Sequence, residues 1–295
     1  MNASQEESAT NRPRLLACLA HPDDESFGPG GTLALYSSRG VEVHLVCATN
    51  GDVGTVDPEF LRGFENIAAL RRAELDCAVQ ALGIHELHML GYRDSGMPGS
   101  EENEHRDALA AAPLSEVVDR LVRIIRKVRP QVVLTFDPIG GYFHPDHIRM
   151  HDATVEAFHA ASDASRLPDA GPVHRPQKLY YHTFSRRWLK LAVRIMPLLG
   201  QDPTSWGRND DIDLAEVSKH DFDIHASVDV SEALEAKEMA AACHASQRED
   251  ADSRGGLLTW IRDALNQTEN FSRAFPPADD GVHEEDLFEG VDLER

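Results

Sequence analysis

Short apolar stretches alternate with longer amphipathic stretches along the first half of this 295-residue chain. Residues 15–20 are continuously apolar, which is typical of a strand buried on both faces of a parallel sheet. The other predicted strands lie at residues 41–48, 86–90 and 132–136. The helices predicted from apolar spacing lie at residues 30–39, 64–82, 114–129 and 146–160. This alternation predicts an α/β fold with a mostly parallel sheet and helices on both faces.

The chain beyond residue 160 is less regular and is expected to form a smaller C-terminal portion. The elements predicted there are strands at 178–184 and 224–230, helices from 186, at 231–246 and at 257–266, and a polar loop at 200–213. We expect a polar tail over 1–13, one domain over 14–275 and an acidic C-terminal tail over 276–295. Within the domain, the core is assigned to residues 14–160 and the shaping of the substrate pocket to residues 161–275.

The formal net charge of −21 excludes several kinds of partner. A protein that binds DNA or RNA neutralises phosphates with basic side chains, so no nucleic acid partner is expected. The same charge disfavours an anionic membrane surface, and no apolar stretch reaches the length of a membrane span. The N-terminus lacks the apolar segment of a secretion signal. We therefore expect a cytoplasmic protein, with a homo-oligomer left open.

The four cysteines are Cys18, Cys47, Cys77 and Cys243, and no two of them form a CxxC pair. Cys18 and Cys47 lie in apolar stretches, where a thiol usually packs as a small apolar side chain. Neither a disulfide framework nor a thiolate zinc site is therefore expected.

Polar clusters follow each of the four predicted strands of the core. The clusters are residues 21–25, 49–52, 91–96 and 137–147. In open α/β sheets, ligands bind beyond the carboxyl ends of the strands. The spacing alone therefore predicts a binding or catalytic site at this edge of the sheet.

The first cluster, His21-Pro22-Asp23-Asp24, offers one imidazole and two adjacent carboxylates in a tight turn. Neighbouring Asp side chains point in different directions, so one can bind a metal ion while the other faces the substrate. The last cluster, His144-Pro145-Asp146-His147, adds two imidazoles that bracket a carboxylate. Two His ligands and one Asp with an open coordination position are typical of a catalytic zinc site. Fe²⁺ or another divalent ion fits the same donors.

A simpler interpretation exists for each motif taken alone. A His-Pro-Asp turn often does no more than begin a helix, and Asp146 would serve as the cap of the helix that follows. Both motifs fall at strand ends of one predicted sheet, and this coincidence favours the metal site.

At these residues the chain resembles the LmbE-like, or PIG-L, family of zinc-dependent N-deacetylases. The resemblance covers roughly residues 14–160, and more weakly the region to about 250, and it rests on Ala-His-Pro-Asp-Asp-Glu at 20–25 and His-Pro-Asp-His at 144–147. Smaller matches, around Arg71, Arg93-Asp94-Ser95-Gly96-Met97 and Asp137 with Gly140-Gly141-Tyr142, resemble the actinobacterial branch that acts on mycothiol and its precursor. The resemblance implies a Rossmann-like sheet, one zinc ion per chain and hydrolysis of an amide on a sugar.

The resemblance also implies a role for each matching residue. The implied zinc ligands are His21, Asp24 and His147. Asp23 would be the general base, and His144 would stabilise the oxyanion or protonate the leaving amine, with Asp146 tuning His144. Tyr142 would close over the carbonyl oxygen. The implied substrate contacts are Arg71, Asp94 and His244.

Each of these secondary assignments has a structural alternative. Tyr142 could pack on the sheet edge, and Arg71 could be a solvated helix residue. Asp94 could stabilise a turn, and His244 could be an ordinary histidine on a helix. The remaining histidines without a comparable context, namely His85, His88, His151 and His159, are interpreted as structural.

The leading functional hypothesis is a zinc-dependent hydrolase that removes an N-acyl group, most simply N-acetyl, from a glucosamine-type sugar or its conjugate. The alternative within the enzyme class is an amidase that cleaves thiol conjugates of a mycothiol-like compound, suggested by Phe275-Pro276-Pro277 and the acidic segment after it. A sugar-binding module without catalysis is a third hypothesis. Such a module would be expected to lose Asp23 or a metal ligand, and both are present.

Overall fold

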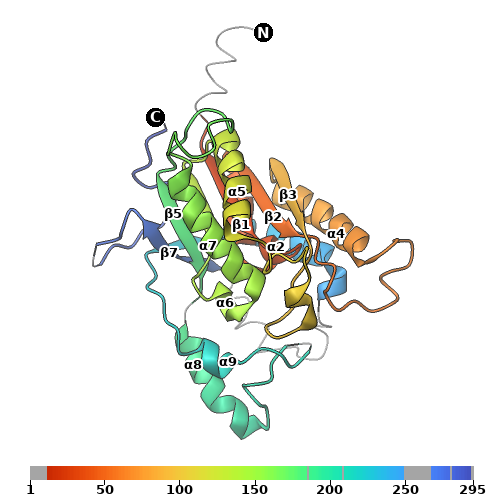
Figure 1. The fold of residues 1–295 in the computed structure, drawn as a ribbon. Helices are drawn as coiled ribbons and strands as arrows, with labels where there is room; N and C mark the ends of the chain where they lie inside the picture. Colours follow the sequence, from red (N-terminus) through yellow and green to blue (C-terminus); the bar gives the residue numbers. More distant parts are fainter. Residues whose placement is uncertain (1–11, 185, 208, 249–266, 280, 294–295) are drawn as a thin grey trace.

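A computed structural model describes residues 12–184, 186–207, 209–248, 267–279 and 281–293, and Figure 1 shows its fold. Its centre is one seven-stranded sheet with the order β3-β2-β1-β4-β5-β7-β6. The strands are β1 (Arg14–Leu19), β2 (Glu42–Thr49), β3 (Glu86–Tyr92), β4 (Val132–Phe136), β5 (Lys178–Thr183), β6 (Ala226–Asp229) and β7 (Thr268–Phe275). Strands β1 to β5 run parallel, and β7 is antiparallel to both of its neighbours. The predicted mostly parallel α/β sheet is confirmed.

Helices cover both faces of this sheet (Figure 1). The long helices are α3 (Gly30–Ser38), α4 (Ile67–Leu82), α5 (Leu114–Val128), α7 (Pro145–Ala160), α8 (Arg186–Ile195) and α10 (Leu234–Cys243). The short ones are α2 (Asp24–Phe27), α6 (Gly140–Phe143) and α9 (Leu214–Val217). Helices α5 and α7 pack together on one side, and α3, α4 and α10 pack together on the other. Helices α8 and α9 project from the edge of the sheet that carries the polar loops (Figure 1).

Capping residues explain where helix α4 begins and ends. In α4, the side chain of Asn66 accepts the N–H of Ala69, and Gly83 ends the helix with a φ of 68°. The helix therefore begins three residues later than predicted. Helix α5 presents one apolar stripe to the core, in which Val117, Val118, Leu121, Ile125 and Val128 are buried and Ile124 is half-buried.

Strand β7 was not predicted from the sequence, although it completes the sheet. Its Phe271 is fully buried, and the strand fills the gap between β5 and β6. The segment after it, predicted as an acidic tail, packs against the sheet in its described part, where Leu287 is fully buried. Glu284 is also buried and accepts hydrogen bonds from Lys178 and Arg273, at 2.6 Å each. The helix predicted over 257–266 lies outside the described residues, as do residues 1–11 of the predicted N-terminal tail.

The expectation of no disulfide was wrong. Cys77 of α4 and Cys243 at the end of α10 form a disulfide bond across a sequence separation of 166 residues. The two helices pack against each other, which brings together two cysteines whose spacing in the sequence gives no indication of pairing. Cys18 and Cys47 are buried free thiols, as predicted.

Helices in the described part of the chain are all too short or too polar to cross a membrane. The predicted cytoplasmic location stays a prediction, and so does the open possibility of a homo-oligomer.

Replacing Glu284 by Ala should lower the free energy of unfolding by about 3 kcal/mol, because the Lys178 charge would stay buried without its carboxylate. Urea unfolding followed by circular dichroism measures this loss. The matched control is Glu285→Ala, since Glu285 is exposed and its loss should change stability by no more than about 0.5 kcal/mol. Equal stabilities of the two variants would contradict the packed position of this segment.

Candidate functional site

The polar loops after β1, β2, β3 and β4 converge at one edge of the sheet, as the strand ends predicted. They surround a pocket of about 550 Å³. Six of the predicted site residues line it, namely His21, Asp23, Arg71, Asp94, Tyr142 and His144. Gly207, Asn209, Asp211 and Ile212 of the predicted polar loop form part of its rim. A second hollow, of about 680 Å³, is lined by Phe27, Met239 and other residues of α2 and α10, and none of the predicted site residues faces it.

Three predicted ligands place their donor atoms around one point. His21 Nδ1 lies 3.1 Å from His147 Nε2, and Asp24 Oδ1 lies 3.3 Å from the same atom. Asp24 Oδ2 lies 3.6 Å from His21 Nδ1. A tetrahedral ion with bonds of about 2.0–2.1 Å separates its ligand atoms by roughly 3.3 Å. The donor set therefore fits a zinc ion or a similar divalent ion.

Each of these ligands is held in orientation by further hydrogen bonds. The carbonyl of Gly140 lies 3.1 Å from His147 Nδ1, which leaves Nε2 of this ring free to bind a metal. Asp24 Oδ2 accepts the backbone N–H groups of Ala20, at 3.1 Å, and of His21, at 2.7 Å. Burial raises the pKa of Asp24, but the His147 and His21 rings outweigh it and bring the pKa well below its ordinary value. Asp24 is therefore ionised and ready to bind a cation.

Asp146 contacts two of the predicted site residues. Its carboxylate lies 3.1 Å from His21 Nε2 and accepts hydrogen bonds from the N–H and hydroxyl of Ser95, the former at 2.9 Å. Only its backbone N–H reaches His144, through Nδ1 at 3.2 Å. The side chain of Asp146 therefore orients His21, a predicted metal ligand, and it is the backbone N–H of Asp146 that contacts His144.

Asp23 stands beside the metal donors in an unusual backbone conformation, with a φ of 140°. Such a φ is rare for any residue other than glycine, so surrounding contacts must hold it. Arg71 Nη2 lies 3.0 Å from the Asp23 carboxylate and also donates to the Pro22 carbonyl. Burial raises the pKa of Asp23 to about 6, although the Arg71 guanidinium acts in the opposite direction. Near neutral pH, this carboxylate can both accept and release a proton.

His144 and Tyr142 face the pocket as neutral donors. His144 Nδ1 accepts the N–H of Asp146, so the ring proton is on Nε2. Burial and the nearby His21 and His147 rings lower the pKa of His144 well below its ordinary value. Burial raises the pKa of Tyr142, whose ring centroid lies 6.0 Å from that of His144. Both side chains can therefore donate hydrogen bonds at neutral pH.

The three predicted substrate contacts have different surroundings. Asp94 lines the pocket, lies 3.6 Å from His21 Nε2 and accepts the N–H of Gly96 at 2.8 Å. Arg71 also lines the pocket, but its guanidinium is engaged with Asp23 and only 2% of the residue is exposed. His244 is fully buried, does not line the pocket and lies 2.6 Å from Glu25.

Sequence reasoning missed two contacts that support the site. Arg186, at the start of α8, forms a fully buried ion pair with Asp137 at 3.1 Å and donates to the carbonyl of Gly141. This contact connects α8 to the loop that carries Tyr142. The second is the contact between Glu25 and His244 at 2.6 Å, which joins two residues that the sequence had named without pairing them. No local pattern singles out Arg186, because Arg187 and Lys190 of the same helix are also basic.

Comparison with known proteins gives a matching family model, GlcNAc-PI de-N-acetylase (PIG-L), over residues 16–158. A 1D-myo-inositol 2-acetamido-2-deoxy-alpha-D-glucopyranoside deacetylase from Streptomyces scabiei is 35% identical, over 94% of this chain and 90% of its own length. The enzyme of the same name from a Nocardioides species is 38% identical, over 79% of this chain and 83% of its own length.

Solved structures share the fold at lower identity. N,N'-diacetylchitobiose deacetylase from Pyrococcus horikoshii is 22% identical with a TM-score of 0.60, covering 92% of this chain and 93% of its own. The 4-carboxy-2-hydroxymuconate hydratase from Pseudomonas putida is 19% identical with a TM-score of 0.58, covering 92% of this chain and 99% of its own. The fold thus occurs with more than one reaction, and the side chains of the site must decide between them.

The full-length relatives carry a deacetylase name, and the site keeps every residue of the two motifs. The chain belongs to the PIG-L family of de-N-acetylases, and it is a hydrolase of carbon–nitrogen bonds other than peptide bonds.

Proposed function

We propose that this protein uses a zinc ion to remove the N-acetyl group from the glucosamine unit of a glucosaminyl-inositol. The observation that carries the proposal is the pair of adjacent carboxylates, because Asp24 belongs to the metal donors whereas Asp23 faces the pocket. This division provides a ligand and a base within one turn of the chain.

The residues that would hold the zinc ion are His21, Asp24 and His147. When bound, zinc polarises an amide carbonyl and makes water nucleophilic at neutral pH. The carboxylates of Asp24, Asp94 and Asp146 surround His21 and raise its pKa well above the ordinary value, even though burial lowers it. This excess of negative charge supports binding of a divalent cation at this point.

Asp23 would accept a proton from the attacking water, since it is the pocket-facing carboxylate next to the metal donors. The same group could then deliver that proton to the leaving amine, for which a pKa of about 6 is suitable. Arg71 keeps the carboxylate in place through its contact at 3.0 Å.

His144 and Tyr142 would stabilise the negative charge that develops on the carbonyl oxygen. The proton on His144 Nε2 and the phenol proton of Tyr142 are both available on the pocket side of these residues. Because His144 is neutral before the reaction, its first role is donation of a hydrogen bond to the oxyanion.

The substrate assignment rests on the names of the relatives together with the size of the pocket. A volume of about 550 Å³ accommodates a ligand of disaccharide size. Asp94 is the pocket carboxylate best suited to accept hydrogen bonds from sugar hydroxyls. The full-length relatives are deacetylases, which favours this function over cleavage of a thiol conjugate.

The two adjacent carboxylates should respond differently to substitution. Asp24→Ala should lose the bound metal, because one of three ligands is removed. Asp23→Asn should keep about one zinc ion per chain and lose activity by a factor on the order of 10²–10⁴, because the base is removed. Metal analysis and an amine-release assay on the N-acetylglucosaminyl-inositol measure the two effects. An Asp23→Asn protein with full activity would show that the base is a different residue.

Metal identity can be tested by removal and replacement. Protein treated with a chelator should lose activity, and Zn²⁺ should restore it to the level of the untreated protein. Addition of Fe²⁺ under anaerobic conditions is the parallel arm, since the same three donors accept this ion. Higher activity with Fe²⁺ than with Zn²⁺ would replace zinc in the proposal.

The choice of substrate can be tested by direct competition. The protein should deacetylate an N-acetylglucosaminyl-inositol with a kcat/KM at least about tenfold above that for a bulky thiol conjugate, a difference of about 1.4 kcal/mol in transition-state binding. A reversed preference would favour the conjugate amidase.

A further inference from the structure

Helix α4 presents three polar or reactive side chains along one face, at Arg71, Glu74 and Cys77. The spacing of three residues places them next to one another on the helix surface. Arg71 reaches the Asp23 carboxylate, Glu74 reaches Ser246, and Cys77 is bonded to Cys243. One helix therefore contacts both the base and the end of α10.

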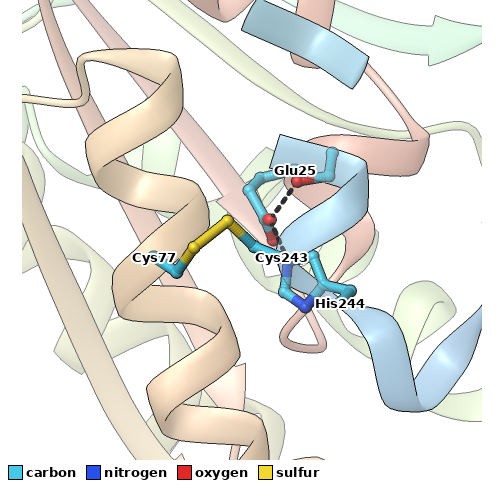
Figure 2. The surroundings of a disulfide bond; sticks show 5 residues. Glu25, Cys77, Cys243 and His244 are labelled. Carbon is cyan, nitrogen blue, oxygen red and sulfur yellow. Dashed lines mark hydrogen bonds and ion pairs between the residues drawn. A yellow bond between two sulfur atoms is a disulfide. The ribbon is translucent and has the colours of Figure 1, made fainter. Parts of the chain in front are cut away.

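The end of α10 is attached to α4 on both sides of His244. On one side Cys243 forms the disulfide, and on the other the N–H and hydroxyl of Ser246 each donate to the Glu74 carboxylate at 2.8 Å. His244 lies between these attachments and is fully buried. Figure 2 shows its ring turned toward Glu25, with Nε2 at 2.6 Å from Oε1 of that carboxylate.

Glu25 also contacts the backbone of the proposed base, Asp23. Its second oxygen, Oε2, accepts the backbone N–H of Asp23 at 3.0 Å. Asp23 is the residue whose φ is 140°. The hydrogen bond to its N–H therefore stabilises this uncommon backbone conformation. Ser26 donates to Oε1 at 2.6 Å, and Glu25 itself is 1% exposed. Asp23 is therefore connected to α10 by two chains of contacts. One runs through Arg71 and α4, and the other runs through Glu25 and His244.

We propose that Glu25 is a positioning residue for the deacetylation, and that the Cys77–Cys243 disulfide holds it in place through His244. The proposal rests on the assigned role of Asp23 as the base. Glu25 does not touch the substrate in this scheme. It keeps the backbone of Asp23 in a conformation that the chain would otherwise leave, and the disulfide keeps His244 at the distance that Glu25 requires.

The disulfide is open to chemical control, because Cys77 is exposed on the surface of α4. A trialkylphosphine reduces it without chelating the metal as a dithiol would. The S–S bond breaks, two thiols form with protons from water, and the phosphine takes the oxygen of that water as its oxide.

The role of Glu25 is tested by comparing Glu25→Ala with Glu25→Gln. The alanine variant should lose kcat by a factor on the order of 10² with KM and zinc content unchanged, because the alignment of the base is disturbed. Its Tm should also fall, because buried His244 loses its carboxylate partner. The glutamine variant keeps an oxygen for the Asp23 N–H and should recover most of the loss. Arg72→Ala, at an exposed position on α4, is the control and should keep wild-type activity.

Wild-type kcat in the folded, zinc-loaded Glu25→Ala protein would overturn the proposal. Loss of zinc, or a loss of kcat that follows the unfolded fraction of the protein, would also overturn it, since Glu25 would then be structural. If Asp23→Asn remained fully active, the proposed base would fail instead, so the two failures are distinguishable.

The disulfide is tested with the phosphine and with a Cys77→Ala/Cys243→Ala double variant. Reduction should lower kcat of the wild type, with thiol titration confirming two new thiols, and the double variant should show the lowered kcat without responding to the phosphine. Unchanged kcat in fully reduced protein would overturn the role of the disulfide. His244→Ala should likewise lower kcat at constant KM, whereas a raised KM at constant kcat would assign His244 to substrate contact.

Discussion

The parallel pairing of β1 with β4 is the constraint on which the site depends. Leu15, Leu16 and Ala17 are paired with Val132, Val133 and Leu134, so the two strands end at the same edge of the sheet. The chain then continues directly into His21 on one side and, through a short loop, into His144 on the other. Two motifs separated by more than a hundred residues thus meet because two apolar strands share a register. The metal donors need no additional domain to bring them together.

Much of this arrangement is predictable from the sequence, because it follows from strands and the residues after them. Apolar stretches, of which only the first is continuous, identify β1, β2 and β4, and the polar residues beyond them identify the pocket. The contacts that fail prediction are those between elements distant in the chain. Neither Cys77 nor His244 has a local signal, since their partners are decided by the packing of α4 on α10. Strand β7 also has no local signal in the sequence, because it is not part of a strand–helix–strand repeat and pairs with β5 in the antiparallel direction.

The roles of individual carboxylates were the least predictable part of the site. Asp23, Asp24, Asp94 and Asp146 are chemically alike, and only their hydrogen bonds distinguish them. Asp24 faces the ring nitrogens of two histidines, whereas Asp146 is enclosed by Ser95 and His21. A motif states which side chains are present, but the direction of each one depends on backbone angles such as the φ of Asp23. Asp146 contacts His144 through its backbone N–H, whereas its carboxylate contacts His21 and Ser95.

The disulfide also changes the covalent topology of the molecule. It closes residues 77–243 into a ring that contains β3, β4, β5 and β6, and the motif at 144–147 lies inside this ring. The motif at 21–25 lies outside, so the metal donors belong to both the ring and the open chain. A cut in the Pro- and Gly-containing loop at 161–176 would therefore leave a single covalent species. Under oxidising conditions the fragment that carries His244, β6 and β7 would stay attached to the fragment that carries both motifs.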